Sequence, residues 1–469
     1  MVGGCLDDAG LAHYTPASMS APSFLTAQFI VSAITIAIVV HVILITCAYL
    51  IYVERKICAY VQDRIGPNRV GFDFGQPWLS PLKGCLGLGQ SLADGLKFLL
   101  KEDYTPNRVD KVLFTLAPMI IIIPALIGFI VIPWGGMWNC PSFTIPILDW
   151  HIAGGPVHIV GANFSVGVVY LLAVGSLGVY GVTLGGWASN NKYSFLGGLR
   201  ASAQMISYEI PLGLALMGAL LIMGTVVPAG IVQYQATNGW LVFAQPLGAL
   251  IFFITILAEA NRAPFDNAEC EQELVGGYHT EYSAMRFALF FLAEYAHLVT
   301  SSALFVLLFF GGYSLNFLPF VPEIPLLSPE SMTLFAVLAK FLVFFTKVVL
   351  LISFSMVIRW TIPRLRFDQI MMMAWQQVIP LSLALVVMNS IMIYFGMTGY
   401  LPMFVGNVGL IVLLIGIQPM IPKPTSNNKL ALFGSRFSPM PGEVVHTTSR
   451  EVMALADHPL QGTSIKVKG

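Results

Sequence analysis

LAEANRAPFDNAECEQELVGGYHTEYSAMR, residues Leu257–Arg286, is a strongly acidic connection between two long apolar segments. Its acidic residues are Glu259, Asp266, Glu269, Glu271, Glu273 and Glu281, and Glu294 follows inside the next apolar segment. This density is unusual, because the whole chain of 469 residues has only 24 acidic residues. Carboxylates at the edge of a membrane are costly to desolvate, and they commonly handle ions or protons or hold a partner. The stretch therefore predicts a membrane protein whose acidic connection has a function.

The composition supports a polytopic membrane protein. The chain is 56% hydrophobic and 10% charged, with a mean hydropathy of +0.77, whereas a soluble protein carries about 25% charged residues. The formal net charge of zero argues against nucleic acid as a partner. The six cysteines form no CxxC motif, and no glycine-rich phosphate-binding motif stands between a strand and a helix. We therefore expect no metal, iron–sulfur cluster or other cofactor bound by this chain.

Apolar runs long enough to cross a membrane, which takes about 20 residues, recur along the chain. The nine runs lie near 25–53, 112–133, 164–187, 203–226, 241–258, 287–311, 333–358, 375–396 and 402–421. We predict an all-α polytopic membrane protein with about nine transmembrane helices.

The basic residues predict the topology. All but two of the 24 Lys and Arg residues fall in alternate connections or in the C-terminal tail. By the positive-inside rule, the N-terminus lies outside and the C-terminus in the cytoplasm. The predicted organisation is an outer segment 1–24, a transmembrane domain 25–421 and a cytoplasmic tail 422–469. The predicted inner loops are 54–111, 188–202, 259–286 and 359–374.

The first inner loop contains a predicted amphipathic helix, Gly89–Lys101. Leu92, Leu96, Leu99 and Leu100 share one face, which is typical of a helix lying along the membrane surface. The alternative is a soluble surface helix packed on another loop.

Glu209 is a candidate proton site inside the fourth apolar run, in QMISYEIPLGLAL. Pro211 follows two residues later, and a proline frees the carbonyl four residues before it and kinks the helix. An ionisable carboxyl beside a kink within hydrocarbon favours a functional role. The alternative is a carboxyl that Arg200 or a nearby lysine neutralises for packing alone.

Two lysines and two histidines also lie within apolar runs. Lys340 and Lys347 are seven residues apart and share a helix face, so we expect a functional or charge-pair role for them. His297 shares a face with Glu294, and together with Glu259 and Glu209 these side chains could form a titratable path inward. His41 stands alone, and we interpret it as an interior histidine rather than a ligand.

The acidic connection has local features of its own. Asp266 and Glu269 have the spacing of a capping box with Asp266 as N-cap, which places Glu269 and Glu273 on one helix face and Glu271 on another. Arg262 and Arg286 are the only cations in the segment. Several carboxylates should therefore lack a local partner and raise one another's pKa. The alternative is a solvated patch that docks a basic partner subunit.

Four motifs resemble one known family. They are ERKICAYVQDRIGPNRVG (Glu54–Gly71), ISYEIPL (Ile206–Leu212), AEANRAPFDNAECEQELVGGYHTEYSAMRFALFFLAEYAH (Ala258–His297) and RWTIPRLRFDQIMMMAW (Arg359–Trp375). The chain is thereby identified as a member of the family of the H subunit of bacterial NADH:quinone oxidoreductase, which is subunit 1 of mitochondrial complex I. The resemblance covers about residues 25–400.

The resemblance implies a proton-pumping oxidoreductase of the respiratory chain in the bacterial inner membrane. It implies quinone as substrate, FMN and iron–sulfur clusters in partner subunits, and contacts with hydrophilic quinone-site subunits, small membrane subunits next to antiporter-like ones, and lipid. By motif, the residues of the carboxylate path are Glu209, Glu259, Asp266, Glu269, Glu271, Glu273, Glu281 and Glu294, with Lys347 as a matching family lysine. By motif, the residues that line or brace the quinone tunnel are Glu54, Arg64, Arg262, Arg286, Arg364, Arg366 and Asp368.

Three other functions remain open from the sequence. A related membrane subunit serves energy-converting hydrogenases without a quinone, and the full Glu54–Gly71 motif favours the quinone enzyme. A stand-alone proton-coupled transporter is disfavoured because no inverted repeat is visible. A passive anchor would not need intramembrane Glu209, Lys340 and Lys347. The first 24 residues, the ninth run and the tail depart from the simplest family pattern and suggest a bacterial chain.

Overall fold

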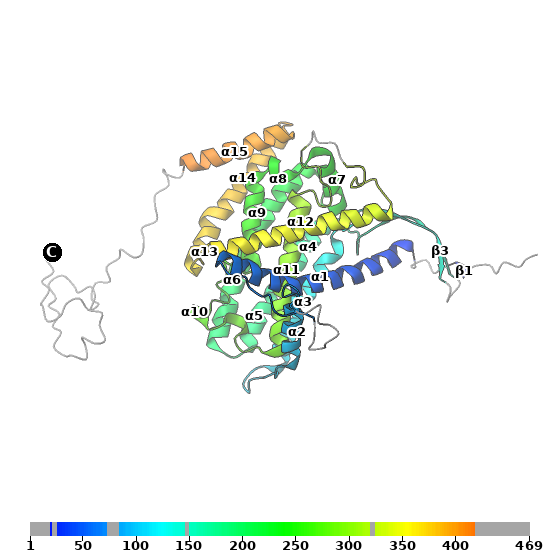
Figure 1. The fold of residues 1–469 in the computed structure, drawn as a ribbon. Coiled ribbons are helices and arrows are strands. Elements are labelled where there is room, and N and C mark those ends of the chain that lie inside the picture. The colour runs from blue at the N-terminus through cyan, green and yellow to red at the C-terminus, as the bar shows by residue number, and fades with distance from the viewer. Residues whose placement is uncertain (1–18, 21–25, 73–83, 146–149, 319–323, 418–469) are drawn as a thin grey trace, which may run out of the picture. The chain divides into compact units, whose positions relative to one another are not determined.

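The computed structural model describes residues 19–20, 26–72, 84–145, 150–318 and 324–417 (Figure 1). The chain divides into two units, Met1–Leu410 and Ile411–Gly469. Of the second unit, only the end of one helix is described. The predicted tail 422–469 and nearly all of the predicted outer segment 1–24 lie outside the described residues.

Helices make up most of the described chain. They are α1 Ala27–Val61, α2 Gln90–Leu100, α3 Lys111–Ile127, α4 Gly167–Ser176, α5 Gly178–Ala188, α6 Lys192–Met223, α7 Pro228–Asn238, α8 Leu241–Ala244, α9 Pro246–Glu259, α10 Glu271–Leu274, α11 Ala284–Phe309, α12 Leu334–Thr361, α13 Phe367–Met373, α14 Ile379–Tyr394 and α15 Tyr400–Ile417. Short 3₁₀ or π turns are η2 Gly128–Val131, η3 Gly277–His279 and η4 Ala374–Val378.

Five short strands accompany the helices in the part of the chain that the structure describes. They are β1 Met19–Ser20, β2 Met137–Cys140, β3 Phe143–Ile145, β4 Trp150–Ile152 and β5 Gly155–His158. The described strands form a sheet of order β1-β4-β3 and an antiparallel β2-β5 pair, most of it in the connection between α3 and α4.

The all-α polytopic fold is confirmed. In the described residues, seven helical segments are long and apolar enough to cross a membrane: Ala27–Val61, Lys111–Val131, Gly167–Ala188, Lys192–Met223, Ala284–Phe309, Leu334–Thr361 and Phe367–Tyr394. The predicted fifth and ninth runs correspond to shorter apolar helices, Pro246–Glu259 and Tyr400–Gly416. The fifth run breaks at Gln245 because Pro246 has no backbone N–H to continue a helix from α8 and instead begins α9.

Two long helices organise the packing. α6 packs against α5, α9 and α14, and α11 packs against α1, α3, α9 and α12 (Figure 1). Glycines allow the close approach of α5 and α6, because a Cβ on Gly186 would lie 2.6 Å from the carbonyl oxygen of Ser194. The acidic connection therefore emerges between helices that are already tightly packed.

The connections predicted to share one side of the membrane meet at the acidic connection. Its ion pairs to the other three loops are Arg286–Asp103 (3.4 Å), Arg262–Glu54 (3.5 Å), Glu273–Arg200 (2.5 Å) and Asp266–Arg364 (2.9 Å). These contacts agree with the alternation of basic residues along the sequence. Which side is cytoplasmic stays a prediction.

The helix predicted at residues 89–101 is present as α2. Its leucines Leu96, Leu99 and Leu100 are exposed, whereas Asp94 is buried against α1, where it pairs with Arg55 at 2.8 Å. The helix is thus anchored through its polar face and presents its apolar face outward. Its position at the membrane surface stays a prediction.

We expect Gly277→Ala to destabilise the acidic connection. Gly277 has φ +67°, and a Cβ there would lie 1.8 Å from the carbonyl oxygen of Ala268. The substitution should cost more than about 1 kcal/mol, since alanine strains a positive φ and clashes with backbone. Limited proteolysis of the purified complex should show faster cleavage within residues 261–283.

Gly213→Ala in α6 is the matched control, because a Cβ there meets nothing within 4 Å. This variant should be neutral or slightly stabilising. Equal protease resistance of the two variants would contradict the close backbone approach at Gly277.

Candidate functional site

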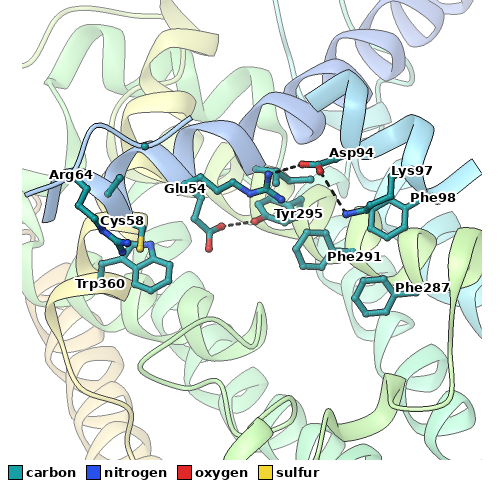
Figure 2. A pocket seen from close by; sticks show the side chains of 14 residues that line it. Glu54, Cys58, Arg64, Asp94, Lys97, Phe98, Phe287, Phe291, Tyr295 and Trp360 are labelled. Carbon is teal, nitrogen blue, oxygen red and sulfur yellow. Dashed lines mark hydrogen bonds and ion pairs between the residues drawn. The ribbon is translucent and has the colours of Figure 1, made fainter. Parts of the chain in front are cut away.

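A cavity of about 600 Å³ opens between α1, α2, α11 and the end of α12. Its walls are largely aromatic and aliphatic, with charged groups at the edges. Figure 2 shows Arg64, Cys58 and Trp360 at one side and Lys97, Phe98 and Phe287 at the other. The volume lies within the range of pockets that bind small molecules, and the lining combines apolar rings with a few charged groups.

One edge of the cavity is fixed by an ion-pair cluster between α1 and α2. Asp94 Oδ2 lies 2.8 Å from Arg55 Nη1, and Asp94 Oδ1 lies 3.6 Å from Lys97 Nζ (Figure 2). The buried carboxylate neutralises part of the local positive charge and holds α2 in place. Both cations remain partly exposed at the cavity wall.

Glu54 lies in the wall and has three partners. The hydroxyl of Tyr295 donates to Glu54 Oε2 (Figure 2). Arg359 Nη1 lies 2.8 Å from Glu54 Oε1, and Arg262 Nη1 lies 3.5 Å from Oε2. A buried carboxylate needs such partners, because burial of an unpaired charge is very costly.

Arg262 connects the cavity wall to the membrane interior. Its Nε lies 2.9 Å from Glu294 Oε1 on α11, and its guanidinium stacks over the ring of Tyr295 at 4.1 Å. Burial alone would lower the pKa of Arg262, but Glu294, Tyr295 and Glu54 raise it well above its usual value. Arg262 is therefore a permanent cation shared between Glu54 and Glu294.

Gln204 of α6 positions this arginine. Its side-chain amide donates to the carbonyls of Ala258 and Phe265, both at 2.8 Å, and to Asn261 Oδ1 at 3.1 Å. These bonds hold the turn after α9 against α6. The buried turn therefore has a fixed geometry from which Arg262 reaches Glu294.

Further carboxylates lie in contact with polar partners deeper in the helices. Glu259 Oε1 at the end of α9 lies 3.6 Å from His297 Nε2 on α11. Glu209 accepts a hydrogen bond from the hydroxyl of Ser176. Among the described residues Arg200 pairs with Glu273 rather than with Glu209, so the neutralisation of Glu209 by Arg200 was a wrong alternative.

The capping box predicted at Asp266 is wrong. Helix α10 begins only at Glu271, with Cys270 as its N-cap. Asp266 instead contacts Arg364, because an arginine from another loop satisfies this carboxylate better than a local backbone N–H. Glu269 precedes this helix, so Glu269 and Glu273 do not share a helix face as predicted.

Several loop carboxylates have their partners outside the segment, as the shortage of local cations predicted: Asp266 pairs with Arg364 and Glu273 with Arg200. Glu281 accepts from the side-chain amide of Asn191 at 2.6 Å. Glu269 accepts from the hydroxyl of Tyr278 at 3.2 Å and lies 3.8 Å from His279 Nδ1. The side chain of Glu271 lies outside the described residues.

Burial dominates the titration of two loop carboxylates. Burial, with a smaller contribution from nearby Asp266, raises the pKa of Glu269 from 4.5 to about 7. Burial also raises the pKa of Asp266, against the opposing charge of Arg364. The predicted rise in pKa within the acidic loop is thus present, although burial causes more of it than like charge does.

The residues expected to line or brace the tunnel divide into three groups. Glu54 and Arg64 line the cavity. Arg262 lies behind Glu54, Arg286 contacts Asp103 and Thr105, and Arg364 contacts Asp266. Arg366 and Asp368 are exposed at the beginning of α13 and are not among the lining residues.

The lysines in α12 contact backbone carbonyls. Lys347 Nζ donates to the carbonyls of Phe310, Gly312 and Ser314 at 2.6 to 2.9 Å and stacks over Trp240. No described carboxylate forms an ion pair with Lys347. Lys340 donates to the carbonyl of Ser331 at 2.7 Å.

Sequence reasoning missed several polar groups at the cavity. Arg359 and Tyr295 contact Glu54, and Arg55 pairs with Asp94. Arg359 directly follows a predicted span and Tyr295 directly follows Glu294, so their positions in the sequence could have marked both as candidate site residues. The pairing of Arg55 with Asp94 depends on the docking of α2, which the sequence does not specify.

Comparisons with known proteins agree on one family. A family model described as NADH dehydrogenase matches residues 34–390. The first H subunit of the NADH-quinone oxidoreductase of Cytophaga hutchinsonii is 42% identical over 76% of this chain and 95% of its own length. The first H subunit of the NADH-quinone oxidoreductase of Geobacter sulfurreducens is 42% identical over 78% of this chain and 96% of its own length. NADH-quinone oxidoreductase subunit 8 of Rhodothermus marinus is 41% identical over 77% of this chain and 96% of its own length. The chain therefore belongs to the NADH dehydrogenase family, as a relative of the H subunits of NADH-quinone oxidoreductases.

Proposed function

We propose that this multi-pass membrane subunit of an NADH-quinone oxidoreductase forms part of the quinone chamber and couples quinone reduction to proton translocation. The observation that carries the proposal is the position of Arg262. This buried cation contacts Glu54 in the wall of the 600 Å³ cavity and Glu294 among the intramembrane carboxylates. One side chain thus joins a site for an apolar substrate to groups that can hold protons.

The cavity fits a quinone chemically. The rings of Phe98, Phe287 and Phe291 offer apolar surface to a substrate ring or isoprenoid chain. Arg55, Arg64 and Lys97 line the same cavity and would stabilise negative charge that develops when the quinone accepts electrons. In this proposal the electrons come from FMN and iron–sulfur clusters held by partner subunits.

The shared arginine supplies the coupling. Charge that develops in the cavity changes how strongly Glu54 and Arg262 attract each other. Because the same guanidinium also pairs with Glu294, any change in its position alters the free energy of protonating Glu294. A change in the protonation of Glu294 can then alter the protonation of Glu259 and Glu209. Glu269 lies in the loop that holds Arg262. Its pKa of about 7 leaves its carboxyl partly protonated near neutral pH.

The proposal includes location and partners. The protein would lie in a bacterial inner membrane with its N-terminus outside and its charged loops inside, where hydrophilic quinone-site subunits dock. Exposed apolar side chains on α12, such as Leu338, Leu342 and Leu350, would face lipid or small membrane subunits. The names of the relatives favour this function over a hydrogenase component or a stand-alone transporter.

Glu209→Gln should reduce proton pumping while the complex still assembles. The amide keeps the size and can still accept from Ser176, but it cannot hold a proton for transfer. Pumping in inverted membrane vesicles, followed with a pH-sensitive dye, should fall at least tenfold, and NADH-driven quinone reduction should slow with it.

Glu330→Gln, in an exposed position outside the helices, is the control and should behave as wild type. Unchanged pumping and unchanged quinone reduction in Glu209→Gln would remove this carboxylate from the path.

Tyr295→Phe should weaken quinone reduction without loss of the fold. It removes the hydroxyl that donates to Glu54 but keeps the ring beneath Arg262. A hydrogen bond to a charged group contributes about 1.5–3 kcal/mol, so kcat/KM for a short-chain quinone should fall about 10- to 100-fold. Tyr180→Phe, at an exposed position on α5, should leave kcat/KM unchanged. Equal kinetics in both variants would show that this contact is irrelevant to the substrate.

The acidic connection should lose stability as pH rises from about 4.5 to about 7. The pKa of Glu269 is about 7 in the packed loop, against 4.5 when exposed. The packed loop therefore binds the extra proton in this interval, and its stability levels off above the higher pKa. Asp266, Arg262, Arg359, Tyr278 and His279 surround this carboxyl.

Hydrogen exchange within residues 265–280, corrected for the intrinsic pH dependence, should accelerate across this interval. The slope should largely disappear in Glu269→Gln and persist in the control Glu102→Gln, which is exposed. A slope that survives in Glu269→Gln would assign it to another group.

A further inference from the structure

His297 faces Glu259 across the interface between α9 and α11. Its Nε2 lies 3.6 Å from Glu259 Oε1, and its Nδ1 lies 3.5 Å from the hydroxyl of Ser301 one turn further along α11. The side chains of His297 and Glu259 are 17% and 12% exposed. Each ring nitrogen thus has a different polar neighbour, which is the arrangement that lets an imidazole accept a proton on one side and release it on the other.

His297 and Glu259 line two small cavities at once. The first also contains Glu294, Asn261 and Tyr278. The second also contains Gly175, Leu212 and Ser301. Each cavity offers about 30 Å³ to the centres of water molecules, enough for about two waters at 10–15 Å³ each. The histidine and its carboxylate therefore stand at the junction of two spaces that can be hydrated.

Residues that neighbour Glu209 or its hydrogen-bond partner Ser176 line the second cavity. Gly175 directly precedes Ser176, whose hydroxyl donates to Glu209. Leu212, which also lines this cavity, lies three residues after Glu209 on α6, about one helical turn away. A Cβ on Gly175 would lie 3.6 Å from Glu259 Oε1 and 3.9 Å from His297 Nε2. The glycine therefore leaves the space open in front of both groups.

A buried oxygen atom at the first cavity lacks a protein partner, which indicates a place for water. Glu294 Oε2 is buried and has no hydrogen-bond partner among the described residues, although Oε1 faces Arg262. Buried carboxylate oxygens are normally bonded, to ordered water where protein groups are lacking. Hydration of this cavity would connect Glu294 with Glu259 and His297.

We propose that His297 carries protons between the Glu294 side and the Glu209 side of this path, a step that rests on the function proposed above. Starting from the Nδ1–H tautomer, Nε2 accepts a proton from the Glu259 carboxyl, which leaves a carboxylate and an imidazolium. Nδ1 then releases its proton to water in the second cavity, directly or through the Ser301 hydroxyl, which gives its own proton to that water as it accepts this one. The ring is now the neutral Nε2–H tautomer, and one proton has moved from the Glu259 carboxyl to the second cavity. A rotation that brings the unprotonated Nδ1 to Glu259 prepares the ring for the next proton.

The test uses the whole complex in membrane vesicles, with His297→Gln compared to His41→Gln. His41 also lies within a membrane helix, but it is exposed on this chain and its Nδ1 lies 2.7 Å from the carbonyl oxygen of Ala37, so the expectation of an interior histidine was wrong for the described part of the chain. Proton pumping should fall at least tenfold in His297→Gln and remain unchanged in His41→Gln. Added imidazole should restore pumping in His297→Ala, which a merely structural role would not allow.

Ser301→Ala is the second variant, since it keeps the ring and removes only the Nδ1 neighbour. It should assemble normally and lower pumping several-fold. Full pumping in His297→Gln while Glu209→Gln is defective would overturn the relay and leave the proposed function standing. Loss of pumping without rescue by imidazole, and with Ser301→Ala unaffected, would also overturn it. Normal pumping in both His297→Gln and Glu209→Gln would instead reject the carboxylate path on which the proposed coupling rests.

Discussion

The buried guanidinium of Arg262 is the constraint on which the site depends. Its side chain is 6% exposed, and a charge at that depth is tolerated only if carboxylates are held against it. Glu54 comes from α1 and Glu294 from α11, so satisfying one arginine fixes the relative positions of two membrane helices and of the turn after α9. The cavity wall and the carboxylate cluster are consequently parts of one electrostatic arrangement and cannot vary independently.

The acidic connection performs this task because its other charges are satisfied from outside. Asp266 is held by Arg364 and Glu273 by Arg200, from loops far away in sequence. Gly277 lets the loop fold back onto the Ala268 carbonyl. Glu269 is the exception. Its hydrogen-bond partner Tyr278 is neutral, and burial keeps away the water that would stabilise a charged carboxylate. The loop thus combines fixed ion pairs with one carboxyl whose charge can change near neutral pH.

Much of this architecture could be predicted from the sequence, because hydropathy and the distribution of basic residues are local quantities. The apolar runs became helices, and the segment predicted as amphipathic is α2. Partner choice could not be predicted in the same way. The spacing of Asp266 and Glu269 fits a capping box. Asp266 nevertheless pairs with Arg364, because a charge-assisted contact is stronger than a hydrogen bond from a backbone N–H at a helix cap. The contact of Arg359 with Glu54 likewise exists only once α1 and α12 have packed.

The ionisable groups within the helices are of two physical kinds, which the sequence presents alike. Lys347 is enclosed by three carbonyls that follow α11 and by the face of Trp240. Its charge complements the negative end of that helix dipole and ties α12 to α11, so it is suited to holding structure. Glu259, His297 and Glu294 instead border small cavities, and Glu294 retains an unsatisfied oxygen. Groups whose contacts are complete have no reason to exchange protons, whereas groups that need water to complete their contacts are placed to do so. By this criterion the proposed proton path would follow the small cavities bordered by α9 and α11, and the assignment of Lys347 to that path stays a prediction.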